Sequence, residues 1–388
     1  MKKSILILSS SDSRHVYNYI DIVLADRKMF EDITIFNVDY VEKTPTAFEE
    51  YYNKRNIEII NHKIWLKFDI PVLKSAYSFL ERSLVLYKHL RQKKYDYIII
   101  HYCSWQSMQW VNWFKGYFKH IIPVFWGGDV LRNKKVNSRQ YKKVYDSSDV
   151  IVLPNAHSLN MFNQSTSHKY KNKAILIQFP TKMVRTFIEA EKSMPNKMDV
   201  LQEYGFPNNR LIVICGHTAT RAERYESMVE ELVQLPNDIK NKCYFVFMMT
   251  YSPEEYQSYQ ETIERLIHKN GLYGCVLKEY LSYEQIQRLH YISDIHITNI
   301  LTDALSCFLQ EELLAGAVLI YGKWLNYHEI ETSDFYAIPF ENINELKTTF
   351  EDVVVNFRFY KERSAINKDG IIKLASEESI LKAWNKYL

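Results

Sequence analysis

The sequence lacks the short motifs that would define a common nucleotide or redox site directly. Its 388 residues contain neither a GxxxxGK[ST] phosphate loop nor a GxGxxG dinucleotide motif. No apolar run approaches the ~20 residues that a membrane-spanning helix needs. The five cysteines are scattered and form no CxxC pair, which predicts reduced thiols in a cytoplasmic protein. With 47% hydrophobic and 24% charged residues, the composition is that of an ordinary globular protein.

The two halves of the chain carry opposite net charge. Residues 1–180 hold 27 Lys and Arg against 16 Asp and Glu, a net charge of +11. The remainder has 22 basic and 30 acidic residues, so the overall charge of +3 hides the asymmetry. Opposite signs predict two domains with different partners, and the basic half favours an anionic surface. The chain is long enough for each domain to bury its own core.

Short apolar runs alternate with helical patterns along the chain. Most runs are unbroken, which favours parallel strands covered on both faces. The segments between them are long enough for crossover helices, so we expect two βαβ domains of the α/β class. These domains are residues 1–180 and 210–365, joined by a linker region at 181–209; a C-terminal helical segment at 366–388 could pack back on the first domain. The expected strands are 4–8, 33–38, 97–101, 121–125, 150–153, 174–178, 211–215, 244–249, 276–278, 295–298 and 318–321.

A glycine turn follows the first strand of the second half, in RLIVICGHTATRAERY. Such a strand–glycine–helix turn directs backbone N–H groups and the helix dipole at an anion. We expect the helix to begin near Thr220, with Thr220 and Glu223 as a capping box. Arg221 and Arg224 would lie in its first turn, where acids are the usual residues, and a bound phosphate would explain the two cations. The alternative is that both are solvated surface side chains. The candidate phosphate ligands are Gly216, His217, Thr218, Arg221 and Arg224.

Two acids stand eight positions apart in TDALSCFLQEELLAGAVLI, residues 302–320. Asp303 is suited to cap a helix, and Gly316 is a natural helix stop before the next strand. Along such a helix Asp303 and Glu311 would be ~12 Å apart and lean toward one side. They could hold two parts of one ligand, because an acid beside a ribose accepts hydrogen bonds from its hydroxyls. The alternative is that Asp303 only caps the helix and that Glu311 is a surface residue.

The second half resembles the nucleotide-binding domain of retaining GT-B glycosyltransferases. In that family two glutamates separated by seven residues precede a glycine and a buried strand. Asp303-x7-Glu311 before Gly316 is similar, with Asp in place of the first Glu. The resemblance implies that Glu311 holds the ribose of a nucleotide sugar and that Asp303 approaches the donor sugar. Glu312 is a rival for the ribose, one residue out of register.

The resemblance extends to two further segments of the second half. It implies that the turn at 216–224 binds the donor diphosphate, with Arg221 and Arg224 where the family has an Arg and a Lys. Residues 278–281 would lie at the carboxyl end of a strand, where open α/β sheets bind ligands. Tyr280 and Leu281 are therefore the candidate contacts for the nucleotide base.

The first half resembles the acceptor domain of the family only in outline. Many relatives carry a histidine in the loop that reads WGGD here, at 126–129, so Asp129 is the candidate catalytic residue in that loop. His101 ends a predicted strand and is a second candidate, with a structural hydrogen bond as the alternative. The residues that replace the family's glycine-rich loop after the first strand include Asp12, Arg14 and His15.

The resemblance implies a cytoplasmic hexosyltransferase with two Rossmann-like, doubly wound domains facing a cleft. The absence of a DxD motif fits a metal-independent enzyme, and the resemblance implies that the anomeric configuration is retained. No cofactor is expected beyond the nucleotide-sugar donor, with UDP among the candidate nucleotides. We expect a sugar or lipid-linked glycan acceptor from bacterial surface polysaccharide synthesis, and no nucleic acid. A non-catalytic partner subunit and a nucleotide-sugar 2-epimerase, both of the same fold, are the alternatives.

Two stretches of the first half combine basic residues with aromatic and aliphatic ones. Residues 62–95 include Trp65 and Leu66 among several lysines, and a helix near 106–119 carries Trp110 and Trp113 on one face. Interfacial helices have this composition, so we expect peripheral binding to an anionic membrane, the inner face of the plasma membrane. Packing of these aromatic side chains on the sheet is the alternative.

Overall fold

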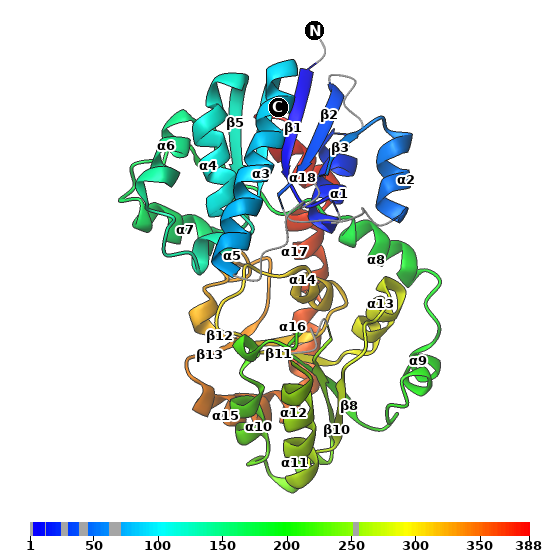
Figure 1. The fold of residues 1–388 in the computed structure, drawn as a ribbon. Coiled ribbons are helices and arrows are strands. Elements are labelled where there is room, and N and C mark those ends of the chain that lie inside the picture. The colour runs from blue at the N-terminus through cyan, green and yellow to red at the C-terminus, as the bar shows by residue number, and fades with distance from the viewer. Residues whose placement is uncertain (1–2, 12, 25–29, 39–45, 62–70, 251–255) are drawn as a thin grey trace. The chain divides into compact units, whose positions relative to one another are not determined.

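Parallel strands form two separate sheets, one in each of the two units into which the chain divides (Figure 1). The computed structural model describes residues 3–11, 13–24, 30–38, 46–61, 71–250 and 256–388. The first unit is Met1–Lys182 with Glu377–Leu388, and the second is Met183–Ser376. The prediction of two parallel α/β domains is confirmed.

The first unit is built on a seven-stranded sheet in the order β3-β2-β1-β4-β5-β6-β7. Leu6 and Leu8 of β1 lie in one apolar core, whereas Ile5 and Ile7 lie in another. Because successive side chains of a strand point to opposite faces, both faces of the sheet are buried, which explains the unbroken apolar runs. The strands are β1 (Lys3–Ser9), β2 (Phe30–Asn37), β3 (Glu58–Ile60), β4 (Tyr95–His101), β5 (Phe118–Val124), β6 (Ile151–Leu153) and β7 (Ala174–Leu176).

Helices cover both faces of this first sheet. The C-terminal helix α18 (Glu377–Trp384), red in Figure 1, belongs to this unit, since Ile380 and Trp384 are buried in the same core as Tyr19. The rings of Tyr19 and Trp384 lie 5.0 Å apart. The other helical segments are α1 (Arg14–Asn18), η1 (Tyr19–Leu24), α2 (Thr46–Lys54), α3 (Pro71–Gln92), α4 (Trp105–Phe114), η2 (Lys115–Tyr117), α5 (Gly128–Leu131), α6 (Arg139–Ser147) and α7 (Ala156–Ser165).

The second unit is built on a six-stranded parallel sheet in the order β10-β9-β8-β11-β12-β13. The chain runs outward from β8 through β9 and β10, then returns to the other side of β8 with β11. Ligands of doubly wound folds bind at the carboxyl ends of strands where the order reverses in this way. The strands are β8 (Leu211–Cys215), β9 (Cys243–Met248), β10 (Gly274–Leu277), β11 (Ile295–Thr298), β12 (Val318–Gly322) and β13 (Ile338–Phe340).

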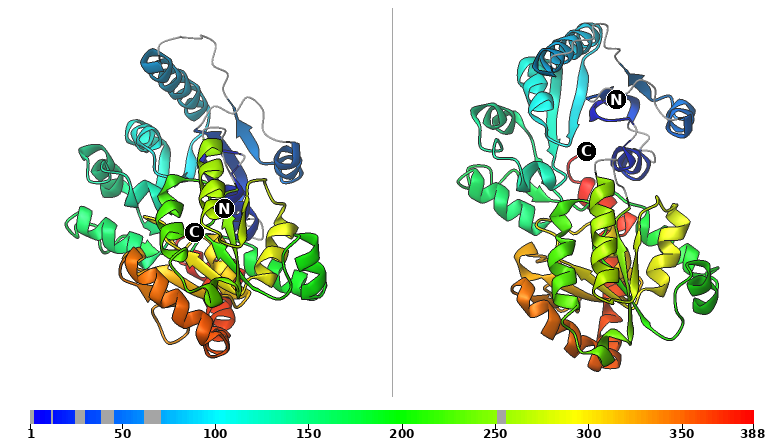
Figure 2. Two further views of the ribbon diagram at one scale, coloured as in Figure 1. Left: turned by 90° about the horizontal axis from the view of Figure 1, so that it is seen from below. Right: turned by 60° about the horizontal axis from the view of Figure 1, so that its bottom comes forward.

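Helices also cover both faces of the second sheet, and Figure 2 shows α10 and α12 side by side on one of them. Residues 181–209, expected as a linker region, contain α8 and α9, whose Phe187 and Val200 are buried in cores of the second unit. The helical segments are α8 (Met183–Glu191), α9 (Lys197–Glu203), η3 (Arg221–Glu223), α10 (Tyr225–Leu232), α11 (Asn237–Lys240), α12 (Gln257–Lys269), α13 (Tyr283–Ile292), α14 (Cys307–Leu314), η5 (Lys323–Leu325), η6 (Ile343–Glu345), α15 (Leu346–Val355), α16 (Phe357–Ser364) and α17 (Ile366–Ala375).

Two edge strands, β3 and β13, were absent from the expected set. A glutamate opens β3 (EII) and a proline interrupts β13 (IPF), so neither of these three-residue strands forms an apolar run. In the described part of the chain, no helix has the length and apolar character required to span a bilayer.

Candidate functional site

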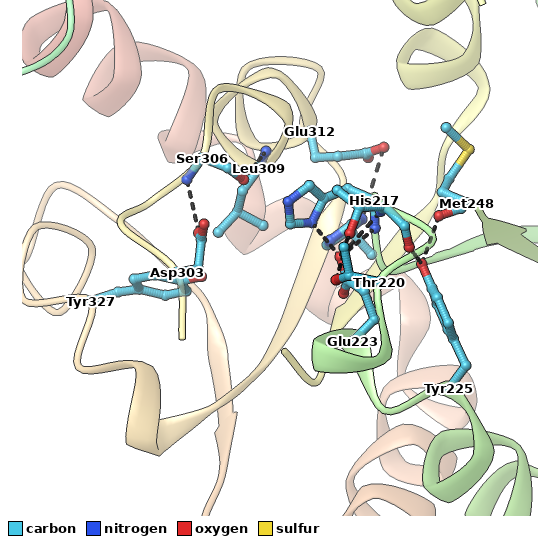
Figure 3. A network of polar contacts seen from close by, with 12 residues as sticks. His217, Thr220, Glu223, Tyr225, Met248, Asp303, Ser306, Leu309, Glu312 and Tyr327 are labelled. Atoms are coloured by element: carbon cyan, nitrogen blue, oxygen red, sulfur yellow. Dashed lines mark hydrogen bonds and ion pairs between the residues drawn. The ribbon is translucent and has the colours of Figure 1, made fainter. Parts of the chain in front are cut away.

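The turn after β8 is held in place by one buried tyrosine. Gly216 has φ +62°, and its N–H donates to the Ile297 carbonyl of β11 at 2.9 Å. A side chain at Gly216 would collide with the Tyr225 ring, so both the positive φ and the close approach require glycine. The Tyr225 hydroxyl lies 2.8 Å from the Thr218 carbonyl and 2.6 Å from the Met248 carbonyl (Figure 3). This contact ties the turn to the carboxyl end of β9.

The backbone amides of this turn point at a carboxylate of the protein itself. Glu223 is fully buried, and its Oε1 accepts hydrogen bonds from His217 N at 3.2 Å and Thr218 N at 3.1 Å. The same oxygen lies 3.1 Å from Thr218 Oγ1 and 3.0 Å from His217 Nδ1 (Figure 3). Burial raises the pKa of Glu223. These two amides are therefore engaged within the chain.

The expected capping box is wrong. The Thr220 side chain makes no capping hydrogen bond, and the α-helix begins at Tyr225 rather than near Thr220. The physical reason is the competing bond of Glu223, whose carboxylate binds the amides of the turn instead of the backbone of Thr220. A short 3₁₀ segment, η3, occupies the residues expected as the first helical turn.

The two arginines of this segment have different surroundings. Arg221 is 69% exposed; its Nη1 lies 3.4 Å from Glu226 Oε1, and its guanidinium lies over the Tyr259 ring at 4.6 Å. Arg224 has φ +54° and donates from Nε and Nη2 to the backbone and side-chain oxygens of Asn299, at 2.8 and 2.9 Å. Burial lowers the pKa of Arg224. Arg224 is thus fixed at the carboxyl end of β11, while Arg221 reaches solvent.

Asp303 lies before the helix that it was expected to cap. Helix α14 begins at Cys307, and Ser306 is its N-cap, accepting from Leu309 N at 3.4 Å. Asp303 Oδ2 accepts from Ser306 N at 2.8 Å and from the Tyr327 hydroxyl at 2.7 Å (Figure 3). The helical separation assumed between Asp303 and Glu311 therefore does not apply. The left-handed Leu305, with φ +57°, turns the chain between the acid and the helix.

Glu311 and Glu312 both contact one buried histidine of α13. His290 Nε2 lies 3.1 Å from Glu311 Oε2, and His290 Nδ1 lies 2.8 Å from Glu312 Oε1. Burial opposes a charge on the ring, but the charge of Glu312 and the hydrogen bonds to both acids raise the pKa of His290 to about 9. His296 lies farther from Glu312, at 4.0 Å, and burial lowers its pKa to about 4.

The segment after β10 carries the two candidate base contacts. Tyr280 is 57% exposed, whereas Leu281 is buried in the core beneath it. Lys278 pairs with Glu264 of α12 at 2.5 Å. An exposed aromatic ring beside a strand end is suited to pack on a flat base, while a buried leucine can only support that segment.

The candidate residues of the first unit are held by local hydrogen bonds. Asp129 is buried, and its two oxygens accept from Trp126 N and Cys103 N, each at 2.7 Å. Burial raises the pKa of Asp129 to about 6. His101 is buried, and Trp126 Nε1 donates to its Nδ1 at 3.3 Å. Burial and the nearby His15 lower the pKa of His101 to about 3. Both residues tie the loops after β4 and β5 together.

His15 lies in an aromatic group of the same unit. Its ring is 4.6 Å from Trp126 and 5.0 Å from Phe179, and burial lowers its pKa to about 4. Asp12 lies outside the described residues, and the side chain of Arg14 does as well. His290 is the residue that the sequence analysis missed. It lies 21 positions before Glu311 in an amphipathic helix, where nothing in the pattern distinguishes it from a core histidine.

Solved structures identify the fold. No protein-family model matches the sequence, and no curated protein is similar to it. Anabaena HepE in complex with UDP is 12% identical with a TM-score of 0.73, over 99% of this chain and 98% of that one. The sucrose-phosphate synthase from Thermosynechococcus elongatus is 12% identical with a TM-score of 0.74, over 99% and 98%. WaaG, a glycosyltransferase involved in lipopolysaccharide biosynthesis, is 11% identical with a TM-score of 0.66, over 98% and 99%. The chain therefore has the GT-B fold of nucleotide-sugar glycosyltransferases, as the resemblance predicted.

Proposed function

We propose that this chain is a glycosyltransferase that moves a sugar from a nucleotide sugar to an acceptor bound by its first unit. The observation that carries the proposal is the carboxylate of Glu311, fixed in the helix that follows β11 in the GT-B fold. Such an acid is suited to accept hydrogen bonds from ribose hydroxyls. HepE has been solved with UDP and with UDP-glucose, which supports a uridine nucleotide as the first donor to test.

The exposure of the two neighbouring acids supports Glu311 as the ribose ligand. The Glu311 side chain keeps 8% of its surface accessible, whereas that of Glu312 has none. A ligand can therefore reach the first carboxylate without unfolding the segment. Glu312 instead serves as the buried partner of His290.

Stabilisation of the departing diphosphate falls to arginine side chains in this proposal. The amides of His217 and Thr218 already bind Glu223, so they have little capacity left for a phosphate. Fixed positive charge near the leaving group stabilises the transition state. Arg221 and Arg224 supply that charge from the segment after β8, and Asp303, oriented by Ser306 and Tyr327, would position the donor sugar. Transfer would retain the anomeric configuration and need no metal ion.

A lipid-linked acceptor is the second element of the proposal. Helices α3 and α4 expose large apolar side chains, including Leu80, Leu84, Trp105 and Trp113. Trp110, by contrast, is buried and donates to Ser83 Oγ at 2.8 Å, so the packing alternative holds for that residue. Exposed apolar side chains on a basic unit are suited to a membrane surface. The expected anchors at 62–70, Trp65 and Leu66 among them, lie outside the described residues.

The test of the proposed reaction is nucleotide release from a panel of nucleotide sugars, beginning with UDP-glucose. We expect release that depends on a glycan acceptor. Binding of the donor without release under any acceptor would favour the non-catalytic partner subunit. Epimerised sugar formed without an acceptor would favour the 2-epimerase.

The test of the membrane surface is sedimentation with vesicles that contain anionic lipid. Each basic residue near such a surface contributes ~1 kcal/mol, screened by salt. Replacing the exposed Lys74 and Lys88 of α3 by Glu should weaken vesicle binding, whereas Lys269→Glu in the second unit should not. Equal binding by wild type and the double variant at low salt would reject this surface.

A further inference from the structure

One buried histidine holds both acids of α14 at once. His290 has no exposed side-chain surface, and each of its ring nitrogens faces a carboxylate oxygen, Glu311 Oε2 at 3.1 Å and Glu312 Oε1 at 2.8 Å. A carboxylate accepts hydrogen bonds and donates none when ionised. A ring that carries a proton on each nitrogen can donate to both acids at once, and the pKa of His290, raised to about 9, makes the ring an imidazolium near pH 7.

The surroundings of the ring leave it little freedom to move. Phe308 of α14 lies edge-on to His290, with ring centroids 4.5 Å apart. The titratable groups that face the ring from other elements are Glu311 and Glu312 of α14 and His296 of β11, whose own pKa is lowered to about 4. His296 is therefore neutral near pH 7 and adds no repulsion. Lys361 of α16 interacts electrostatically with Glu312 as well, so the imidazolium is one of two cations beside these adjacent buried acids.

The same carboxylate of Glu311 is also approached from the start of α13. Burial and the nearby charge of Glu311 raise the pKa of the Tyr283 hydroxyl, which lies 2.6 Å from Thr186 Oγ1 of α8. Glu311 is thus bound by His290 in the last turn of α13 and interacts electrostatically with Tyr283 at the first residue of the same helix.

We propose that His290 is the positioning residue for ribose recognition: it fixes the orientation of Glu311 so that its carboxylate meets the hydroxyls of the nucleotide. This inference rests on the proposed function, since it assigns the ribose to Glu311. His290 itself touches no substrate. It acts through Glu311, and through Glu312, which holds the opposite edge of its ring.

The experiment compares the affinities for UDP and for 2′,3′-dideoxy-UDP by calorimetry. The two ligands share base and diphosphate, so their affinity ratio reports only what the ribose hydroxyls contribute. Wild type should prefer UDP by roughly tenfold or more, as expected for hydrogen bonds to a charged group. His290→Gln should lose most of that preference by weakening UDP and leaving the dideoxy ligand almost unchanged. A structural role alone would weaken both ligands alike.

The matched control is His296→Gln, which removes a buried histidine of the same cluster that makes no hydrogen bond to Glu311. We expect it to keep the wild-type ratio. If His290→Gln does not fold, the wild type alone still tests the inference. The preference for UDP should fall as pH rises through about 9, where His290 loses its proton. Titration of the shared base cancels in the ratio.

The outcomes separate this inference from the proposed function. Equal binding of the two ligands by wild type would overturn the assignment of the ribose to Glu311, and the inference with it. Loss of the preference in Glu311→Gln but not in His290→Gln, with a ratio that stays constant up to pH 10, would overturn the inference alone. Loss of the preference for UDP in both Glu311→Gln and His290→Gln, together with a fall of the wild-type affinity ratio at alkaline pH, supports the inference.

Discussion

Two fully buried histidines, one in each unit, have opposite electrostatic environments. His101 of the first unit has an indole N–H as its hydrogen-bond partner, and burial lowers its pKa to about 3. His290 of the second unit has two carboxylates as partners, and its pKa is raised to about 9. The comparison shows that burial decides the charge state of a histidine only where no charged partner opposes it. A neutral partner leaves the desolvation penalty unopposed, whereas two acids overcome it.

Asp129 of the first unit and Glu312 of the second are two buried acids with different partners. Burial raises the pKa of Asp129 to about 6, and the hydrogen bonds that it accepts from backbone amides of its own loops oppose that rise. Glu312 faces the imidazolium of His290 instead. The second unit also holds a turn with a buried acid, Glu223, but in addition it gathers charges around α14, the helix to which the proposed donor site belongs.

The largest expected effect concerns the pH dependence of stability, to which His101 and His290 should contribute with opposite signs. His101 binds a proton more readily when unfolded, so its contribution is lost as pH falls from 6.5 towards 3, by roughly 5 kcal/mol in total. His290 binds its proton more tightly when folded. Its contribution is complete below pH 6.5 and is lost as pH rises through about 9, by roughly 3 kcal/mol.

Urea unfolding at pH 4, 6.5 and 9.5 measures how the free energy of unfolding depends on pH. We call its fall below pH 6.5 the acid limb and its fall above pH 6.5 the alkaline limb. His101→Gln should remove its own share of the acid limb, beside the shares of His15 and His296, whose pKa values burial also lowers, whereas His290→Gln should remove much of the alkaline limb only. An alkaline limb that persists unchanged in His290→Gln would show that another group is responsible.

Removal of Glu312 should have the next largest effect. Glu312→Ala leaves His290 with one partner in a buried site, and breaking such a pair costs about 3–5 kcal/mol. The free energy of unfolding at pH 7 measures this loss. Replacing both partners with apolar residues, as in Glu312→Met with His290→Leu, should recover part of it, because the fully buried charge of Glu312 is removed together with its partner and the acid that then loses a contact is Glu311, which keeps 8% of its side-chain surface accessible. A double variant no more stable than Glu312→Ala would contradict this account.

Glu311→Ala should affect binding more than folding. We expect the affinity for UDP to fall by about 1.5–3 kcal/mol, the contribution of hydrogen bonds to a charged group. Calorimetry measures the affinity, and thermal unfolding checks that the fold survives. Glu311→Gln is the matched variant, since it keeps the size and removes the charge. Unchanged affinity in both variants would remove Glu311 from the donor site.

The smallest effect concerns Arg221, which is largely exposed. Arg221→Ala should weaken UDP by up to about 1 kcal/mol, because solvent screens an exposed charge. Uridine, which has no phosphate, should bind as before. Arg265→Ala, a change to another exposed arginine of the same unit, should alter neither ligand. Equal losses for UDP and uridine would mean that Arg221 acts through the fold.

Much of the fold could be predicted because apolar runs report burial directly. All eleven expected strands exist, since a strand covered on both faces must be apolar at every position. The turn after β8 could also be predicted, because its positive φ and the close approach of the Tyr225 ring require a glycine at position 216. The acid pair of the second half was noted from its spacing along an expected helix, and the family resemblance supplied the roles proposed for the two acids.

The sequence by itself determined two parallel α/β units, a turn at Gly216 and the presence of acids at 303 and 311, because periodicity and spacing are local properties. Only the tertiary structure decided what those groups contact. Glu223 binds the amides of the turn instead of capping a helix, and His290 reaches Glu311 from another helix. Partners of a buried charge come from segments far apart in the chain, and their distance and orientation are set by how the helices pack on the sheet, which no local pattern encodes.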